Sequence, residues 1–162
     1  MNYHNITKDD MLNGDGLRVV LWVSGCEHNC LGCHNPETHN IDSGIEFDAD
    51  AMTELMVELD QDHIDGITFS GGDPLHLCNR KYITSIAKYI KTNMPNKTIW
   101  LYTGYTFEEV KHLPIIKYLD VIVDGRFVLS LKDNNLHWKG SSNQRVIDVK
   151  RTIQCKEIVL HC

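Results

Sequence analysis

Three cysteines lie close together near the start of the chain. Cys26, Cys30 and Cys33 form a C-x3-C-x2-C pattern within eight residues. Thiolates at this spacing can bind one metal centre, and cysteine thiolates are the usual ligands of iron–sulfur clusters. A [4Fe-4S] cluster held by only three cysteines leaves one iron free to bind something else. The spacing therefore indicates a metal site, and an open one if the metal is an iron–sulfur cluster.

A structural zinc site is the main alternative for the same cysteines. Zinc accepts Cys3His ligand sets, and His28, His34 or His39 could supply the fourth ligand. The pattern follows a predicted strand of an α/β chain, where ligands usually bind, whereas a zinc knuckle normally builds its own small fold. No second Cys or His pair stands at zinc-finger spacing. These observations favour iron, and they leave a non-enzymatic zinc or electron-transfer module as the alternative.

The composition is that of a globular protein. The 162 residues include 22 acidic and 16 basic side chains, for a net charge of −6, with no basic run that could follow a phosphate backbone. The chain has no apolar stretch of membrane-spanning length and no signal-peptide pattern at its start. We therefore expect one cytoplasmic domain over residues 1–162, with no nucleic acid and no membrane as partner.

Outside the C-x3-C-x2-C pattern, single residues carry weaker signals. Cys78, Cys155 and Cys162 are interpreted as buried or incidental thiols, because their spacing supports no motif. Arg18 is interpreted as one half of an ordinary surface ion pair.

Short apolar runs rich in β-branched residues alternate with helical patterns. Strand followed by helix calls for parallel pairing, since a helix is the usual crossover between parallel strands. The chain is too short for a complete eight-unit barrel. We therefore expect an α/β fold with a parallel sheet, as a partial TIM-type barrel, with an open sheet as the alternative. The predicted strands are Leu17–Val23, Ile64–Phe69, Lys97–Tyr102, Leu119–Val123 and Arg145–Val149.

Three helices are predicted between these strands. Residues 52–59 and 83–90 place apolar side chains at the spacing of one helix face. Thr106 and Glu109 form a capping box, which predicts a shorter helix that runs through Leu113 and ends before Pro114. Residues 129–144 are the most polar stretch and are predicted to form a long loop.

Polar and glycine residues follow the later strands. Gly71 and Gly72 permit close approach of backbone to a ligand, and Asp73 adds an acceptor. Thr103 could donate to a carboxylate, and Asp124 could accept from a ribose hydroxyl or an ammonium group. Taken alone, the Gly-Gly-Asp-Pro run is more often a plain turn, and Thr103 and Asp124 fit a turn or helix cap equally well. Because carboxyl ends of parallel strands meet at one edge, we expect these groups to gather near the cysteines.

Together the motifs resemble the radical S-adenosylmethionine superfamily, and within it the activating proteins of anaerobic ribonucleotide reductases. The cysteine pattern resembles that superfamily's cluster motif, and Gly71-Gly72-Asp73-Pro74 resembles its Gly-Gly-Glu-Pro motif with Asp for Glu. Gly32, before the third cysteine, fits the reductase-activating branch, where other members have an aromatic residue. The resemblance also includes residues 13–18, 34–36, 102–105, 124–127 and 140–145.

The resemblance implies a function and a set of ligands. The cluster on the three cysteines would cleave S-adenosyl-L-methionine reductively, and the resulting radical would take hydrogen from a glycine of the large catalytic reductase subunit. Gly71, Gly72 and Asp73 would hold the methionine amino group, and backbone near His34 and Asn35 would support adenine. The implied partners are that subunit and an electron donor such as a flavodoxin or ferredoxin. A superfamily member that acts on a small molecule is the competing interpretation.

Overall fold

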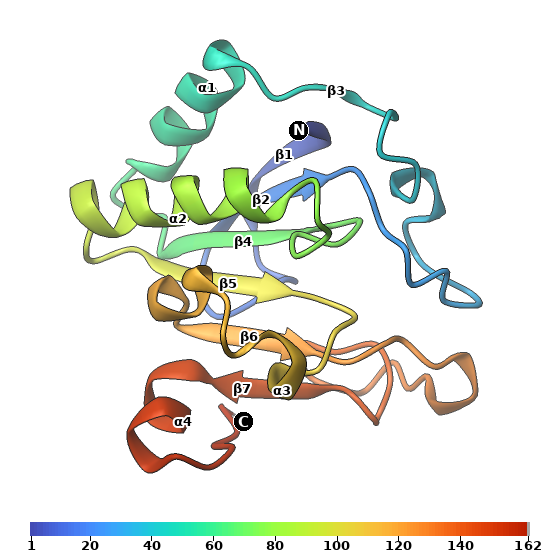
Figure 1. The fold of residues 1–162 in the computed structure, drawn as a ribbon. Helices are drawn as coiled ribbons and strands as arrows, with labels where there is room; N and C mark the ends of the chain where they lie inside the picture. Colours follow the sequence, from blue (N-terminus) through green and yellow to red (C-terminus); the bar gives the residue numbers. More distant parts are fainter. Residues whose placement is uncertain (162) are drawn as a thin grey trace.

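The computed structural model describes residues 1–161, which form one mixed β-sheet with its helices (Figure 1). The strands lie in the order β3-β1-β2-β4-β5-β6-β7. The strands are β1 (Asn2–Asp10), β2 (Arg18–Val23), β3 (Ile45–Glu46), β4 (Gly66–Gly71), β5 (Thr98–Tyr102), β6 (Val121–Asp124) and β7 (Arg145–Asp148). The α-helices are α1 (Ala49–Leu59), α2 (Arg80–Asn93), α3 (Phe107–Val110) and α4 (Val149–Cys155). Short 3-10 helices span Pro36–Thr38, Pro114–Tyr118 and Leu129–Leu131.

The centre of the sheet is parallel, as the sequence predicts. Strands β2, β4, β5 and β6 pair in parallel, with α1, α2 and α3 in the connections between them. In the region described, no helix is long and apolar enough to cross a membrane. Because the four parallel strands run the same way, the loops after their carboxyl ends meet at one edge of the sheet.

The predicted parallel sheet is confirmed only at its centre, and a partial TIM-type barrel is not confirmed. Strand β7 runs antiparallel to β6, and the unpredicted strands β1 and β3 add antiparallel pairs at the other side. The segment between β6 and β7 contains no crossover helix, so β7 starts beside the end of β6 and runs in the opposite direction. The sheet is open, with β3 and β7 as its edge strands.

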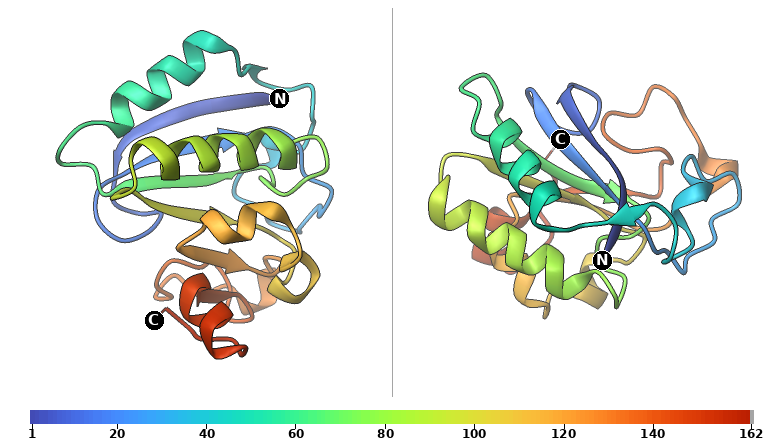
Figure 2. Two further views of the ribbon diagram at one scale, coloured as in Figure 1. Left: turned by 60° about the vertical axis from the view of Figure 1, so that its left-hand side comes forward. Right: turned by 90° about the horizontal axis from the view of Figure 1, so that it is seen from above.

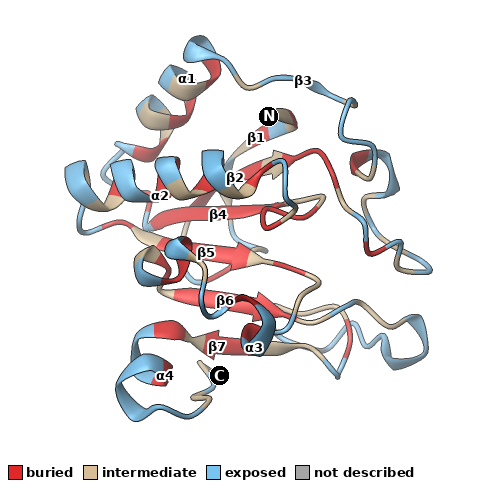
Figure 3. Ribbon diagram, in the orientation of Figure 1, coloured by how far each residue is buried: buried red, intermediate tan, exposed pale blue. Residues whose placement is uncertain are grey.

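Helices α1 and α2 cover one face of the sheet (Figure 2). Asp48 caps α1 by accepting hydrogen bonds from the backbone N–H groups of Asp50 and Ala51. The predicted apolar faces are confirmed, since Leu55 in α1 and Ile83 in α2 are completely buried. The parallel strands β2, β4, β5 and β6 are also mostly buried (Figure 3). This packing holds the carboxyl edge of the sheet in place.

The third helix is shorter than the sequence predicts. The capping box of Thr106 and Glu109 forms, but α3 ends at Val110, so Leu113 lies outside it. Pro114 begins a 3-10 helix instead of ending the α-helix, because the fixed φ of proline suits a first helical turn. Residues 129–144 form the predicted loop, except for the turn at Leu129–Leu131 and an isolated bridge.

The prediction that Arg18 forms a surface ion pair is wrong. Its side chain is fully buried at the start of β2, and burial lowers its pKa to about 10. The guanidinium donates to Thr68 Oγ1 at 2.8 Å and to the Ile67 carbonyl at 2.6 Å, and it lies 5.4 Å from the centre of the Trp100 ring. Arg18 therefore ties the start of β2 to β4 and β5.

Candidate functional site

A cavity of about 280 Å³ lies among the loops that follow β2, β4, β5 and β6. Its lining brings together every predicted site residue except Asp124. These residues are Cys26, Cys30, Cys33, His34, Asn35, Gly71, Gly72, Asp73 and Thr103. Cys26 and Thr103, which are 77 positions apart in the chain, thus contribute to one site. The parallel sheet explains the arrangement, because it places all these loops at the same edge.

The cysteine loop is held by its backbone. The N–H of Gly25 donates to the Thr38 carbonyl at 2.7 Å, and the N–H of Cys26 donates to the His39 carbonyl at 3.1 Å. Glycines with positive φ, Gly25 at +98° and Gly32 at +73°, turn the chain on either side of the first two cysteines. The three thiols are partly buried and line the same cavity.

The three cysteines supply the kind of ligand that an iron–sulfur cluster takes. Within residues 1–161, no three Cys, His, Asp or Glu side chains converge on one ion position. Burial raises the pKa of the Cys26 thiol to about 11, so a metal is needed to stabilise its thiolate at neutral pH.

His28 does not supply a fourth ligand for a zinc site. Its Nε2 lies 2.7 Å from Asp73 Oδ2, and its Nδ1 lies 3.2 Å from Arg126 Nε. Both ring nitrogens therefore have protein partners and neither is free for a metal. His39 also lines the cavity, and its Nε2 is buried without a hydrogen-bond partner among the described residues.

Glycines let the loop after β4 pack on the cysteine loop. Gly71 has φ +106°, and a Cβ there would lie 2.5 Å from the backbone nitrogen of Val23. A Cβ on Gly72 would lie 2.6 Å from the Gly25 carbonyl oxygen. The N–H of Asp73 donates to that same carbonyl at 2.7 Å. Only glycine permits this approach of two backbones, as the sequence indicates.

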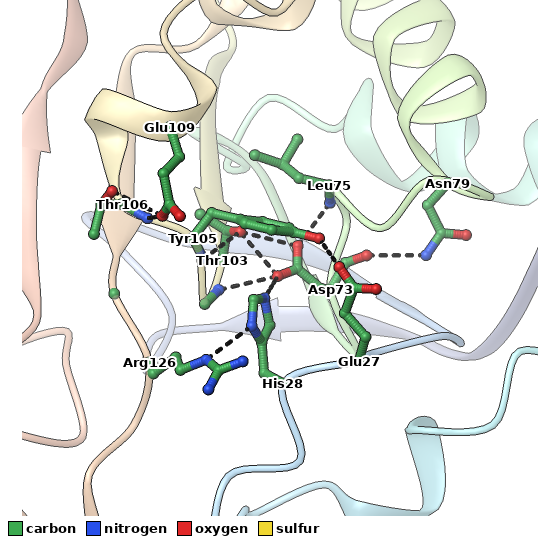
Figure 4. Close-up of polar contacts among 12 residues, drawn as sticks. Glu27, His28, Asp73, Leu75, Asn79, Thr103, Tyr105, Thr106, Glu109 and Arg126 are labelled. Atoms are coloured by element: carbon green, nitrogen blue, oxygen red, sulfur yellow. Dashed lines mark hydrogen bonds and ion pairs between the residues drawn. The ribbon is translucent and has the colours of Figure 1, made fainter.

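The Asp73 carboxylate is buried and fully hydrogen-bonded (Figure 4). Its Oδ1 accepts from the Leu75 N–H at 2.7 Å, and its Oδ2 accepts from the Gly104 N–H at 3.0 Å. The Thr103 hydroxyl donates to both oxygens, and His28 contacts Oδ2. Asp73 therefore joins the loops after β2, β4 and β5, a role that the sequence did not reveal.

Asp124 lies outside the cysteine cavity. Its Oδ2 accepts from the Phe107 N–H at 2.6 Å, and Oδ1 accepts from Arg145 Nε at 3.0 Å. It lines a neighbouring cavity of about 800 Å³ instead. These contacts anchor the start of α3 and the start of β7. Direct contact of Asp124 with a ligand stays a prediction.

The segment from Gly140 to Arg145, whose role the sequence left open, reaches the site. Gln144 Nε2 donates to the Gly125 carbonyl at 2.9 Å, while its Oε1 accepts from the Gly140 N–H at 3.0 Å. Gly140 and Gln144 both line the cysteine cavity, as do Trp22, Tyr102 and Phe127. The Gly-Ser-Ser-Asn-Gln run was a visible signal, but its contact with the loop after β6 requires the antiparallel return of β7.

Known proteins are similar to this chain over most of its length. Residues 12–147 match a family model described as a 4Fe-4S single cluster domain. Similar curated proteins are named anaerobic ribonucleoside-triphosphate reductase-activating protein. That of Enterobacteria phage T4 is 45% identical over 90% of this chain and 93% of its own length. Those of Escherichia coli K12 and Vibrio cholerae are 41% and 39% identical, over 90% and 89% of this chain and 97% and 96% of their own lengths.

Fold, cavity and family model together define an iron–sulfur protein whose cluster domain occupies most of the chain. The residues in the cavity are consistent with that class, because cysteine supplies the thiolates that such clusters need. The chain belongs to the family of anaerobic ribonucleoside-triphosphate reductase-activating proteins.

Proposed function

We propose that this chain is a radical-generating activase of anaerobic ribonucleotide reductase. It binds a [4Fe-4S] cluster on Cys26, Cys30 and Cys33 and uses S-adenosyl-L-methionine to form a glycyl radical on the large catalytic subunit. The observation that carries the proposal is the single cavity that contains all three cysteines together with Gly71, Gly72 and Thr103. The names of the relatives support the choice of partner.

The residues around the cavity have separate tasks. The three cysteines hold the cluster and leave one iron for the cosubstrate. When bound, the reduced cluster supplies the single electron that cleaves the cosubstrate and so initiates hydrogen removal from glycine. Gly71 and Gly72 offer backbone without side-chain obstruction, and Trp22, Tyr102 and Phe127 add aromatic surface to the cavity lining. The proposed electron donor is a flavodoxin or a ferredoxin.

A two-stage anaerobic experiment tests this function. The protein is reconstituted with iron and sulfide, reduced, and mixed with S-adenosylmethionine. We expect 5′-deoxyadenosine and a changed cluster EPR signal. Stoichiometric zinc with no 5′-deoxyadenosine would contradict the proposal.

The second stage adds the catalytic subunit of an anaerobic ribonucleotide reductase. The expected result is the EPR doublet of a glycyl radical. Cosubstrate cleavage without that doublet would instead favour an enzyme acting on a small molecule. Cys33→Ser protein is the negative control, and Cys78→Ser protein, whose altered thiol lies outside the cavity lining, is the matched positive control.

A further inference from the structure

The proposed function assigns no role to His28, although this residue lies between two of the cysteines. Its side chain is only 5% exposed, and both ring nitrogens contact other strand-end loops. A buried imidazole with two directed partners is under tight geometric constraint. A histidine that served only to fill the core would not need contacts to two separate loops.

The contacts determine the tautomer of the ring. Arginine Nε can only donate, so Arg126 donates to His28 Nδ1 at 3.2 Å. Nδ1 is then the acceptor, and the ring proton is on Nε2. From there it is donated to Asp73 Oδ2 at 2.7 Å (Figure 4). The imidazole thus links the loops that follow β2, β4 and β6 in one directed chain.

The loop after β5 closes around the same ring. A Cβ on Gly104 would lie 2.4 Å from His28 Cδ2, so the histidine occupies the space that any other residue there would need. Tyr105 packs edge-on against the ring, with centroids 4.6 Å apart. The Tyr105 hydroxyl also donates to Glu27, the neighbour of His28. The three other strand-end loops, after β4, β5 and β6, therefore all contact the cysteine loop at or beside this residue.

We propose that His28 is a positioning residue that sets where the cluster lies relative to the cosubstrate. It joins the loop that carries the cysteines to Asp73, whose own loop offers Gly71 and Gly72 to the cavity. Fixing one loop on the other fixes the distance between the open iron and the cosubstrate site. The inference rests on the proposed function and names a determinant of cosubstrate binding within it.

Two substitutions separate this role from packing alone. His28→Gln keeps an amide donor for Asp73 and an amide acceptor for Arg126, whereas His28→Leu keeps neither. The Leu variant leaves the Asp73 carboxylate with donors from Thr103, Leu75 and Gly104, so no buried charge is abandoned. His63→Leu is the matched control. It removes an exposed histidine that also contacts a carboxylate, with Nε2 2.9 Å from Asp9 Oδ1.

The reconstituted proteins are compared in iron content, in S-adenosylmethionine dissociation constant and in the EPR change on cosubstrate binding. For His28→Leu we expect wild-type iron content, affinity weaker by about tenfold or more, and a reduced EPR change. His28→Gln should recover most of the affinity, and His63→Leu should match wild type.

Wild-type affinity and an unchanged EPR response in His28→Leu would overturn the inference. So would equal loss of iron from both His28 variants, because that result assigns the histidine to cluster retention alone. Failure of the wild-type protein to bind or cleave S-adenosylmethionine would instead contradict the proposed function, and the two failures are therefore distinguishable.

Discussion

At the scale of single residues, Cys26, Cys30 and Cys33 share a cavity because glycines shape the backbone around them. Gly25 and Gly32 take positive φ values on either side of the first two cysteines. The loop then returns so that the backbone of Cys26 pairs with that of His39. The cysteines can therefore line one cavity.

Serine at any of the three cysteine positions should abolish stable cluster binding. Serine offers a hydroxyl in place of the soft thiolate that iron–sulfur clusters require. We expect iron and sulfide content after anaerobic reconstitution to fall to near background in each variant. Cys78→Ser should keep wild-type content, and a comparable loss in Cys78→Ser would contradict the assignment.

Gly71→Ala should destabilise the fold by about 3 kcal/mol. An added Cβ meets the Val23 backbone at 2.5 Å, in addition to the strain of φ +106°. Gly125→Ala is the matched control, because its φ is +94° but its nearest neighbour atom lies 3.8 Å from the Cβ position. Urea unfolding of the apoprotein should show a clearly smaller loss for Gly125→Ala. Equal losses would show that backbone strain, and not the close approach to β2, dominates at Gly71.

At the scale of elements, side-chain contacts join helices and strands at both ends of the parallel strands. Asp120 makes such contacts at the end opposite the cavity, directly before β6. Its Oδ2 accepts from the Ile99 N–H of β5 at 2.7 Å and from Lys91 of α2 at 2.6 Å, and its Oδ1 pairs with Lys150 of α4. One carboxylate thus joins three elements.

The Asp120 contacts predict a pH dependence of stability. Burial alone would raise the Asp120 pKa, but hydrogen bonds from Lys150, Lys91 and the Ile99 backbone lower it below its ordinary value. A depressed carboxyl pKa stabilises the fold above the unfolded-state pKa of about 4, and the contribution is lost as pH falls further. Asp120→Asn should therefore cost about 2 kcal/mol at pH 7.

Urea unfolding of wild type and Asp120→Asn at neutral and at acidic pH measures this contribution. The difference between the two proteins should shrink as pH drops below about 4. A difference that stayed constant with pH would indicate packing and not charge as its origin.

At the scale of the whole molecule, the cluster should stabilise the fold, because its ligand loops connect to every parallel strand. A ligand that binds only the native state at a thousand times its dissociation constant adds about 4 kcal/mol. For a chain of this length we expect the midpoint of thermal unfolding to rise by about 10 °C on anaerobic reconstitution. Circular dichroism measures the shift, and Cys33→Ser protein treated identically should show none.

The sequence by itself determined the local features of this protein. The cysteine spacing, the Gly71-Gly72 pair, the capping box at Thr106 and the apolar faces of α1 and α2 depend on neighbouring residues, and each is readable from a short window. Alternating strands and helices also determined the parallel centre of the sheet, and with it the edge at which the site lies.

Only the tertiary structure decided which side chains meet across that edge. It brought His28 to Asp73 and Arg126, engaged Asp124 with Arg145 beside the cavity, and buried Arg18. It also decided the antiparallel direction of β7, which carries Gln144 to the site. The physical reason is that these contacts join residues distant in the chain, and neither periodicity nor propensity records such pairings.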